Sequence, residues 1–158
     1  MADTRAVEGA SELAAKFRGL RDDMQRRTAF RMAVAGARVV VRSAKDIARG
    51  LGLMKSGTMV RNIVSKREPN AGAGVAQYNV GVRHGHNLTK KQKSTAKLAV
   101  NKNGRIVKKY ENDPFYWRFI EFDKKGRSGT PFMAPALEQN PGAPIDAMSA
   151  VLDKELAK

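Results

Sequence analysis

Two small groups of residues have types and a spacing that catalysis or metal binding could use. His84 and His86 are the only histidines, and Glu121 and Asp123 lie two residues apart. A zinc site needs three or four ligands, and neither Cys nor carboxylate accompanies the two histidines, so a polar loop is the better interpretation. Paired carboxylates can act as general acid and base, but the basic residues after Asp123 favour ordinary surface ion pairs. Without a catalytic triad, phosphate-binding loop or dinucleotide fingerprint, the sequence predicts no enzyme, no metal and no cofactor.

A basic stretch in the middle of the chain is the sharpest functional feature. Residues 83–109 hold nine basic side chains and no acidic one, which is more than half of the net charge of +15. Such a field indicates contact with a phosphate backbone or an acidic protein surface, or plain solvation. Readout of a specific DNA sequence is disfavoured because no helix-turn-helix or zinc finger is visible. Single-strand binding needs interleaved aromatic residues, and this window has none. The candidate contact residues are Arg83, Lys90, Lys91, Lys93, Lys97, Lys102, Arg105, Lys108 and Lys109.

The second half of the basic stretch predicts a β-hairpin over residues 97–110. Asn103-Gly104 lies there between two short runs rich in β-forming residues, which is a strong hairpin signal. We therefore expect residues 83–110 to form a basic hairpin region within a single domain of residues 1–158.

Large apolar side chains concentrate between residues 115 and 137. Six of the ten aromatic residues lie there, and each can bury roughly 150–250 Å². The alternation of side chains predicts a strand that begins at Phe115, followed by a glycine turn. Because Pro is favoured in the first turn of a helix, a short helix should start near Ala134 or Pro135. The predicted core anchors are Phe115, Trp117, Phe119, Phe122, Phe132 and Leu137.

Periodicity in the rest of the chain predicts an α+β fold. We expect a first helix over residues 7–20, a long Ala- and Arg-rich helix that begins near Asp22 and ends near Gly50 or Gly52, and a last helix from Ile145. Strands are predicted at residues 59–66 and 75–82. The expected architecture is a long N-terminal helix on a small, mostly antiparallel sheet, with an extended basic hairpin and C-terminal helices. The sequence has no apolar run of 18 residues, so no membrane span is expected.

Three short segments resemble a known protein family. Residues 56–63, Ser-Gly-Thr-Met-Val-Arg-Asn-Ile, match its first motif loosely, and residues 116–122, Tyr-Trp-Arg-Phe-Ile-Glu-Phe, match its second well. Residues 131–137, Pro-Phe-Met-Ala-Pro-Ala-Leu, match its third closely. With the long helix, they resemble the tail-component family of long-tailed double-stranded DNA phages, whose members are head–tail joining, neck or tail-completion proteins. Asp123 stands where the family usually has Gly, and the basic stretch looks like an insertion, so the resemblance implies no role for it.

The resemblance implies a virion structural protein without catalysis or cofactor. Such a protein assembles as a homo-oligomeric ring, with genomic double-stranded DNA passing through its lumen. It would contact head-completion or connector proteins and tail-terminator or tail-tube proteins, and no membrane. It would be made in the host cytoplasm and end in the neck or tail of the virion. The main rival hypothesis is a basic, non-specific nucleic-acid-binding protein whose hairpin grips phosphates, and a small nuclease is a distant third.

Overall fold

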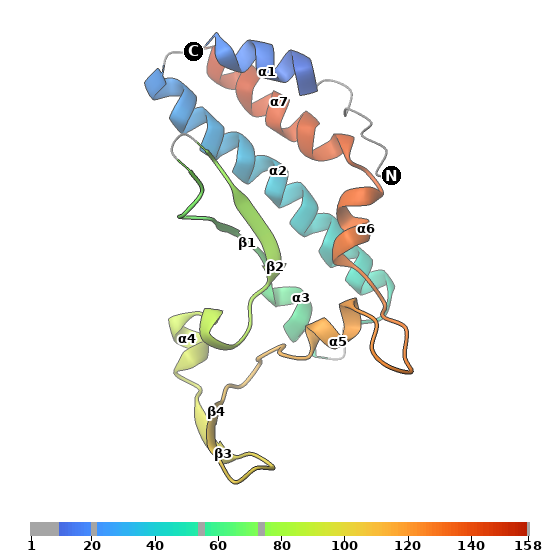
Figure 1. The fold of residues 1–158 in the computed structure, drawn as a ribbon. Coiled ribbons are helices and arrows are strands. Elements are labelled where there is room, and N and C mark those ends of the chain that lie inside the picture. The colour runs from blue at the N-terminus through green and yellow to red at the C-terminus, as the bar shows by residue number, and fades with distance from the viewer. Residues whose placement is uncertain (1–9, 20–21, 54–55, 73–74, 158) are drawn as a thin grey trace.

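The computed structural model describes residues 10–19, 22–53, 56–72 and 75–157. Its elements form an elongated molecule, with a layer of helices at one end and a hairpin extending from the other (Figure 1). The predicted α+β class is confirmed, because a long helix packs on a small antiparallel sheet and further helices follow at the C-terminus. A second two-stranded antiparallel sheet forms the extended hairpin.

The long helix α2 (Asp22–Gly50) is the element on which the others pack. Its composition explains its length, because Ala and Arg are strong helix formers and no Pro interrupts it. It ends where predicted. Gly52 has a φ of 68° and donates its N–H to Arg49, and Leu53 donates to the carbonyl of Ala48, as in a Schellman motif.

Small residues on α2 allow its partners to approach closely. A Cβ atom on Gly36 would clash with the side chain of Met148 and lie 3.3 Å from the carbonyl oxygen of Pro144. Both partners belong to α7 (Gly142–Leu156), which packs alongside α2. Ala44 and Ala48, further along the same helix, are fully buried. The helix thus supports α7 and the sheet because it carries little bulk on the faces that meet them.

The predicted terminal helices are present. The first is α1 (Ala10–Arg18), which ends in a turn at Gly19, and the predicted residues 7–9 and 20 lie outside the described part of the chain. Leu13 and Phe17 of this helix pack against a cluster built on Met32 and Leu152. Near the C-terminus, α6 (Met133–Glu138) contacts α2 and precedes α7.

The first sheet pairs β1 (Ile63–Arg67) with β2 (Tyr78–Val82), and α2 covers one face of it. The strand predicted at residues 59–66 is only partly correct, because the chain first forms a short buried helix, α3 (Thr58–Asn62). Gly57 starts that helix with a φ of 64°, and Asn62 returns its side-chain amide to the carbonyl of Thr58 at 2.8 Å. The strand predicted at residues 75–82 begins three residues later than expected.

The predicted hairpin is present as β3 (Lys97–Val100) and β4 (Ile106–Lys109). Between the two sheets lie a single 3₁₀ turn, η1 (Gly85–Asn87), and a one-turn helix, α4 (Lys90–Lys93). These short elements lead the chain from the body of the molecule to the hairpin (Figure 1).

The aromatic segment is a helix, α5 (Trp117–Glu121), so the predicted strand is wrong. Pro114 is buried and its carbonyl accepts from the Trp117 N–H, which closes the first turn. The helix ends at Phe122, whose backbone is extended. A run of five residues is too short for its periodicity to separate helix from strand.

Only part of the predicted core is buried. Phe132 is 0% exposed and joins Met59, Val60 and Ile63 in the main cluster, while Trp117 packs at its margin. The core prediction is wrong for four side chains: three on or beside α5 are exposed, and α6 buries Ala136 while its Leu137 is exposed. These four are Phe115, Phe119, Phe122 and Leu137, exposed by 65%, 51%, 59% and 52%.

Replacing Phe132 by Ala should destabilise the fold by about 3–5 kcal/mol, because a fully buried ring leaves a cavity. Chemical denaturation monitored by far-ultraviolet circular dichroism measures this change. Phe115→Ala removes the same atoms from an exposed site and should change stability by no more than about 0.5 kcal/mol. Equal losses for the two variants would contradict the assignment of the core.

Candidate functional site

The basic hairpin, defined here as residues 97–109, is closed by a three-residue turn. Asn101 and Arg105 face each other, with the Asn101 N–H donating to the Arg105 carbonyl at 2.9 Å. Gly104 adopts a φ of 73°, as the third residue of such a loop requires. The side chain of Asn101 accepts from the N–H groups of Asn103 and Arg105, both at 2.9 Å. The Asn-Gly pair thus predicts the hairpin correctly, although the turn contains one residue more than the pair itself.

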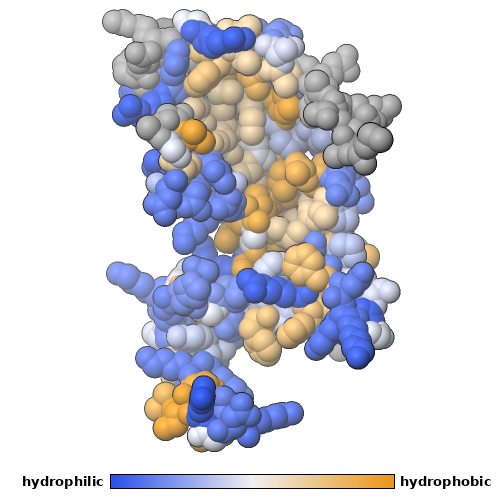
Figure 2. Space-filling view, in the orientation of Figure 1, coloured by the Kyte–Doolittle hydropathy of each residue, from blue (hydrophilic) through white to orange (hydrophobic). Residues whose placement is uncertain are grey.

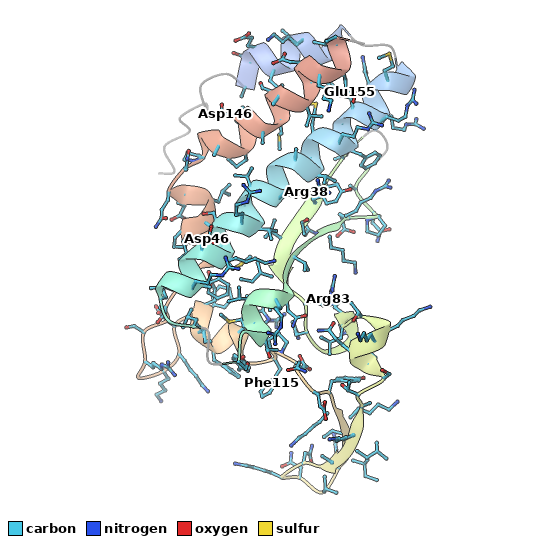
Figure 3. All side chains as sticks on the ribbon, turned by 180° about the vertical axis from the view of Figure 1, so that it is seen from behind. Arg38, Asp46, Arg83, Phe115, Asp146 and Glu155 are labelled. Carbon is cyan, nitrogen blue, oxygen red and sulfur yellow. The ribbon has the colours of Figure 1, made fainter. Side chains whose placement is uncertain are left out.

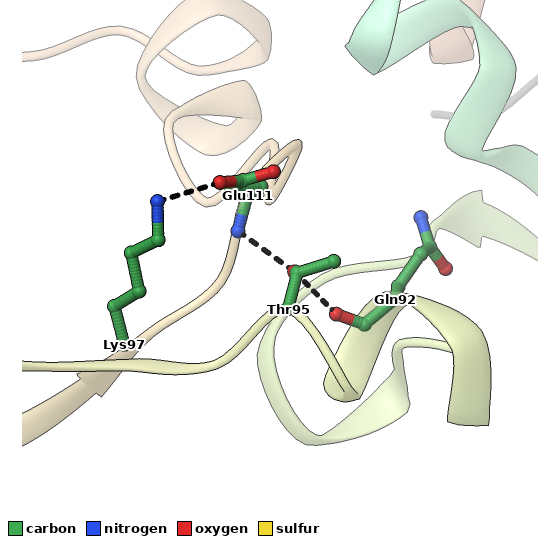
Figure 4. A network of polar contacts seen from close by, with 4 residues as sticks. All are labelled: Gln92, Thr95, Lys97 and Glu111. Atoms are coloured by element: carbon green, nitrogen blue, oxygen red, sulfur yellow. Dashed lines mark hydrogen bonds and ion pairs between the residues drawn. The ribbon is translucent and has the colours of Figure 1, made fainter.

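Polar contacts fasten the base of the hairpin (Figure 4). The Thr95 hydroxyl donates to the Gln92 carbonyl at 2.7 Å and accepts from the Glu111 N–H at 3.1 Å. The Lys97 ammonium lies 2.8 Å from a carboxylate oxygen of Glu111. These bonds join Thr95 and Lys97, just before and at the start of β3, to Glu111 after β4, so the two ends of the hairpin are held together.

Side-chain hydrogen bonds connect this region to α3 in the body, one of them from the Thr58 hydroxyl to the Asn112 side chain at 3.2 Å. The Gln92 amide donates to the buried Asn62 side chain at 2.9 Å, and Asn62 in turn donates to the Thr58 carbonyl. Gln92 also completes a capping box with Thr89 at the start of α4. The orientation of α4, and with it the exit of the hairpin, therefore depends on a polar contact with α3.

The ion pair at the hairpin base changes the pKa values of both partners. The hydrogen bond from Lys97 lowers the pKa of the Glu111 carboxyl, and the hydrogen bond to Glu111 raises the pKa of the Lys97 ammonium. In the β3–β4 register Lys97 faces Lys109, and like charges opposite each other destabilise a sheet. Glu111 offsets that repulsion at one of the two positions.

The predicted basic residues fall into three groups. Arg83 follows β2 and is half-buried where the chain leaves the body (Figure 3). The other two groups are exposed, one on α4 and one on the hairpin. They comprise Lys90, Lys91 and Lys93 on α4, and Lys97, Lys102, Arg105, Lys108 and Lys109 on the hairpin. The structure therefore places eight of the nine on one protruding unit.

One face of the hairpin is mostly apolar and is exposed. Leu98, Val100 and Ile106 share that face with Lys108, which is opposite Leu98, because alternate residues and directly opposed residues point the same way. They are 72%, 66% and 72% exposed. A two-stranded ribbon is marginally stable in water on its own. The sequence indicates the charge of this hairpin, and the structure adds an uncovered apolar face.

The residues of the two candidate catalytic groups lie in different surroundings. His84 lies beside Trp117 with ring centroids 6.2 Å apart, and His86 is exposed. Among the described residues, no three His, Asp or Glu side chains are grouped to hold a metal ion. The Asp123 carboxylate accepts from the Gly129 N–H at 2.7 Å. Glu121 has a different role.

The buried carboxylate of Glu121 holds the start of α6. It is 7% exposed and accepts from the N–H groups of Phe132, Met133 and Ala134 at 2.9–3.2 Å. These are backbone groups that a helix start leaves without an intrahelical partner. Glu121 is therefore a capping residue that ties α5 to α6.

The outer face of α2 carries a basic stripe. Six residues separated by four, seven, four, three and four positions lie along one side of the helix. Arg31 pairs with Glu155 at 2.6 Å, and Arg49 with Asp46 at 2.6 Å; Arg38 is exposed (Figure 3). Its helical spacing could have identified this stripe as a second basic surface. Its members are Arg27, Arg31, Arg38, Arg42, Lys45 and Arg49.

Comparison with protein-family models, curated proteins and solved structures finds no match for this chain. Within the described ranges, no helix combines the length and apolar character needed to cross a bilayer.

Replacing Glu121 by Ala should lower the free energy of unfolding by about 1–3 kcal/mol, because three backbone N–H groups at the start of α6 lose their acceptor. Urea denaturation measures the loss. Asp123→Ala removes an exposed carboxylate with one backbone partner and should cost less. A larger effect for Asp123 would contradict the capping role of Glu121.

Protection of the amides at the hairpin base from hydrogen exchange should decrease as the pH falls from neutrality into the acid range. Because its pKa is lowered in the folded state, Glu111 stabilises the hairpin base at pH values above its ordinary pKa. This stabilisation is lost as the pH falls through the lowered value. Because the pKa of Lys97 is raised, its contribution is lost only as the pH rises through that raised value. Amides near Lys97 and Glu111, corrected for intrinsic exchange rates, should lose protection in acid.

The effect will be modest, because the two side chains are 75% and 55% exposed and solvent screens surface pairs. Glu111→Gln should remove the acid step, whereas Lys108→Gln, which removes a charge from the same hairpin without touching the pair, should keep it. An unchanged acid step in Glu111→Gln would show that another group controls the hairpin base.

Proposed function

We propose that this chain is a structural virion protein at the head–tail interface of a long-tailed DNA phage, as a neck or tail-completion protein. It assembles with copies of itself into a ring around the DNA channel and has no catalytic role. Head-completion or connector proteins lie on one side of the ring and tail-terminator or tail-tube proteins on the other. The protein is made in the host cytoplasm and ends in the virion.

The arrangement of the three family-like segments supports this proposal. Met59, Val60 and Ile63 come from the first segment, and Phe132 and Ala136 from the third, and all five lie in one core cluster. Three side chains of the second segment pack against the same cluster, namely Tyr116, Trp117 and Ile120. The three segments that resemble the phage family are distant in the sequence, and their residues lie together in or against one core cluster.

The observation that carries the proposal is the uncovered apolar surface of the subunit. The apolar face of the hairpin is largely exposed, and so are Phe115, Phe119 and Phe122 at the α5 end. Soluble monomers rarely leave large contiguous apolar patches uncovered. Sheet edges and protruding hairpins are also places where another chain adds strands. A subunit of this kind is suited to completing its packing with neighbours.

A basic, non-specific nucleic-acid-binding protein remains the second candidate. The specific observation in its favour is the pair of basic surfaces, one on α4 and the hairpin and one along α2. Phosphate contacts by Lys and Arg provide most of non-specific DNA affinity. In the ring proposal these surfaces face DNA in the lumen or acidic surfaces of neighbouring rings.

Native mass spectrometry and negative-stain imaging of the purified protein test the proposal. We expect a closed oligomer of one defined subunit number. In the quadruple variant with Lys90, Lys91, Lys93 and Lys97 changed to Gln, free duplex binding should change little while joining of heads to tails in a phage assembly assay fails.

The rival function gives the opposite result in the same variant. If the basic hairpin is the main DNA grip, duplex affinity should fall in this variant. The slope of log K against log salt should also drop by roughly 0.9 for each DNA phosphate that the variant no longer neutralises. A wild-type protein that stays monomeric and binds DNA tightly with a steep salt dependence would contradict the ring.

A further inference from the structure

An open groove of about 840 Å³ runs across the body of the molecule. Its floor is α2, where Gly36 and Ala37 contribute little bulk, and its walls are β2 on one side and α6 with the start of α7 on the other. Figure 2 shows an apolar band over these elements. Val75, Phe122 and Leu137 line the groove and are 52%, 59% and 52% exposed.

The β2 wall of this groove presents the edge of a strand. Three consecutive strand residues, 78–80, line it together with residues 75–77 just before the strand, whereas contact with one face of a strand would involve alternate residues only. The Glu68 N–H bonds to the Gln77 carbonyl and the Arg83 N–H to the Asn62 carbonyl, which fixes the bonded pairs of the β1–β2 ladder.

By the alternation of an antiparallel ladder, the backbone N–H and C=O groups of Tyr78 and Val80 point away from β1. In the part of the chain that the structure describes, these groups have no backbone partner outside the ladder. An apolar trough beside a free strand edge is the geometry that β-strand addition uses.

We infer that the groove receives the basic hairpin of a second copy of this chain. The inference rests on the proposed ring and identifies its subunit contact. Leu98, Val100 and Ile106 need an apolar surface to cover them, and the groove offers one. Six of the ten exposed large apolar residues in the described part of the chain belong either to the hairpin or to the groove. The hairpin extends from the end of the molecule remote from α7 (Figure 1), so it does not fill its own groove.

Charge complementarity favours the basic hairpin of a second copy, rather than nucleic acid, as the occupant of the groove. Residues 83–109 carry nine basic side chains and no acidic one, whereas residues 128–153 carry three acidic side chains and no basic one. The second segment includes α6 and most of α7, which form a wall of the groove. Glu121 is the one charged residue among those that line the groove, and its buried carboxylate is already bonded to the start of α6. Asp153 pairs with Lys16 at 3.5 Å, so the acidic charge beside the groove comes from Glu138 and Asp146. A phosphate backbone has neither the apolar surface nor the charge to bind there.

The contact joins two different surfaces, the hairpin of one copy and the groove of the next. Such heterologous contacts make rings when the rotation between copies closes. Each copy then donates one hairpin and accepts one. This would add the β-strands of a neighbour to β2, and a sheet of three or more strands with one apolar face is stable where two strands are marginal.

Two single substitutions test the contact. Leu98→Asp damages the hairpin and Leu137→Asp damages the groove, and both positions are exposed, so each variant should fold as the wild type does. Each alone should change the closed assembly into monomers by native mass spectrometry. Mixed together they should form a one-to-one heterodimer, because one intact hairpin and one intact groove remain. Leu156→Asp, at an exposed site on neither surface, should keep the assembly.

Cysteine cross-linking gives a second readout, since the chain has no Cys. Oxidised protein carrying both Val100→Cys and Leu137→Cys should form disulfide-linked multimers, and the pair Val100→Cys with Leu156→Cys should not. Closed assemblies that persist in both Asp variants, or an absence of cross-links in an assembled Val100→Cys and Leu137→Cys protein, would overturn the docking while leaving the ring. A wild type that is monomeric at all concentrations would overturn both.

Discussion

The fold depends on the way Glu121 joins α5 to α6. Its buried carboxylate accepts the N–H groups at the start of α6, and Phe132, the residue just before that helix, enters the core with no exposed surface. The loop between the two helices has mostly exposed side chains, and its own bonds, such as Thr130 N–H to the Ile120 carbonyl and Gly129 N–H to Asp123, do not reach the first turn of α6. One charged group therefore connects α5, whose Trp117 and Ile120 pack against the main cluster, to the start of α6 beside the buried Phe132. Removing such a group leaves several buried donors unpaired at once, which is why its effect exceeds that of an ordinary surface carboxylate.

The elements that could be predicted are those whose signals are local. The long helix follows from Ala and Arg content and ends at Gly52 as expected, and the hairpin follows from Asn103-Gly104 between β-forming runs. The strand prediction fails for the aromatic segment because five residues do not establish a period, and the sequence does not reveal α3 for the same reason. Burial of Phe119 or Leu137 depends on which way a short helix turns on its neighbours, and tertiary contacts determine that.

The candidate site divides in the same way. The basic residues of α4 and the hairpin are identifiable from charge alone, and the structure places eight of them on one protruding unit. The groove could not be identified, because its lining comes from α2, β2, α6 and α7, segments that lie far apart in the sequence. The sequence does not indicate the free edge of β2 either, since that edge results from the absence of a third strand beside Tyr78 and Val80 in the described structure.

The distribution of charge favours one relative orientation of two copies, with the hairpin of one facing the groove of the other. A net charge of +15 alone would make copies of the chain repel one another. The positive charge is concentrated in the middle of the chain, however, and the segment that forms α6 and most of α7 is acidic overall. Copies that approach with hairpin toward groove bring opposite charges together, whereas hairpin toward hairpin brings like charges together. Electrostatics of this kind suppresses the symmetric pairing and favours head-to-tail contact. Apolar burial then supplies affinity, and charge selects the orientation in which that burial occurs.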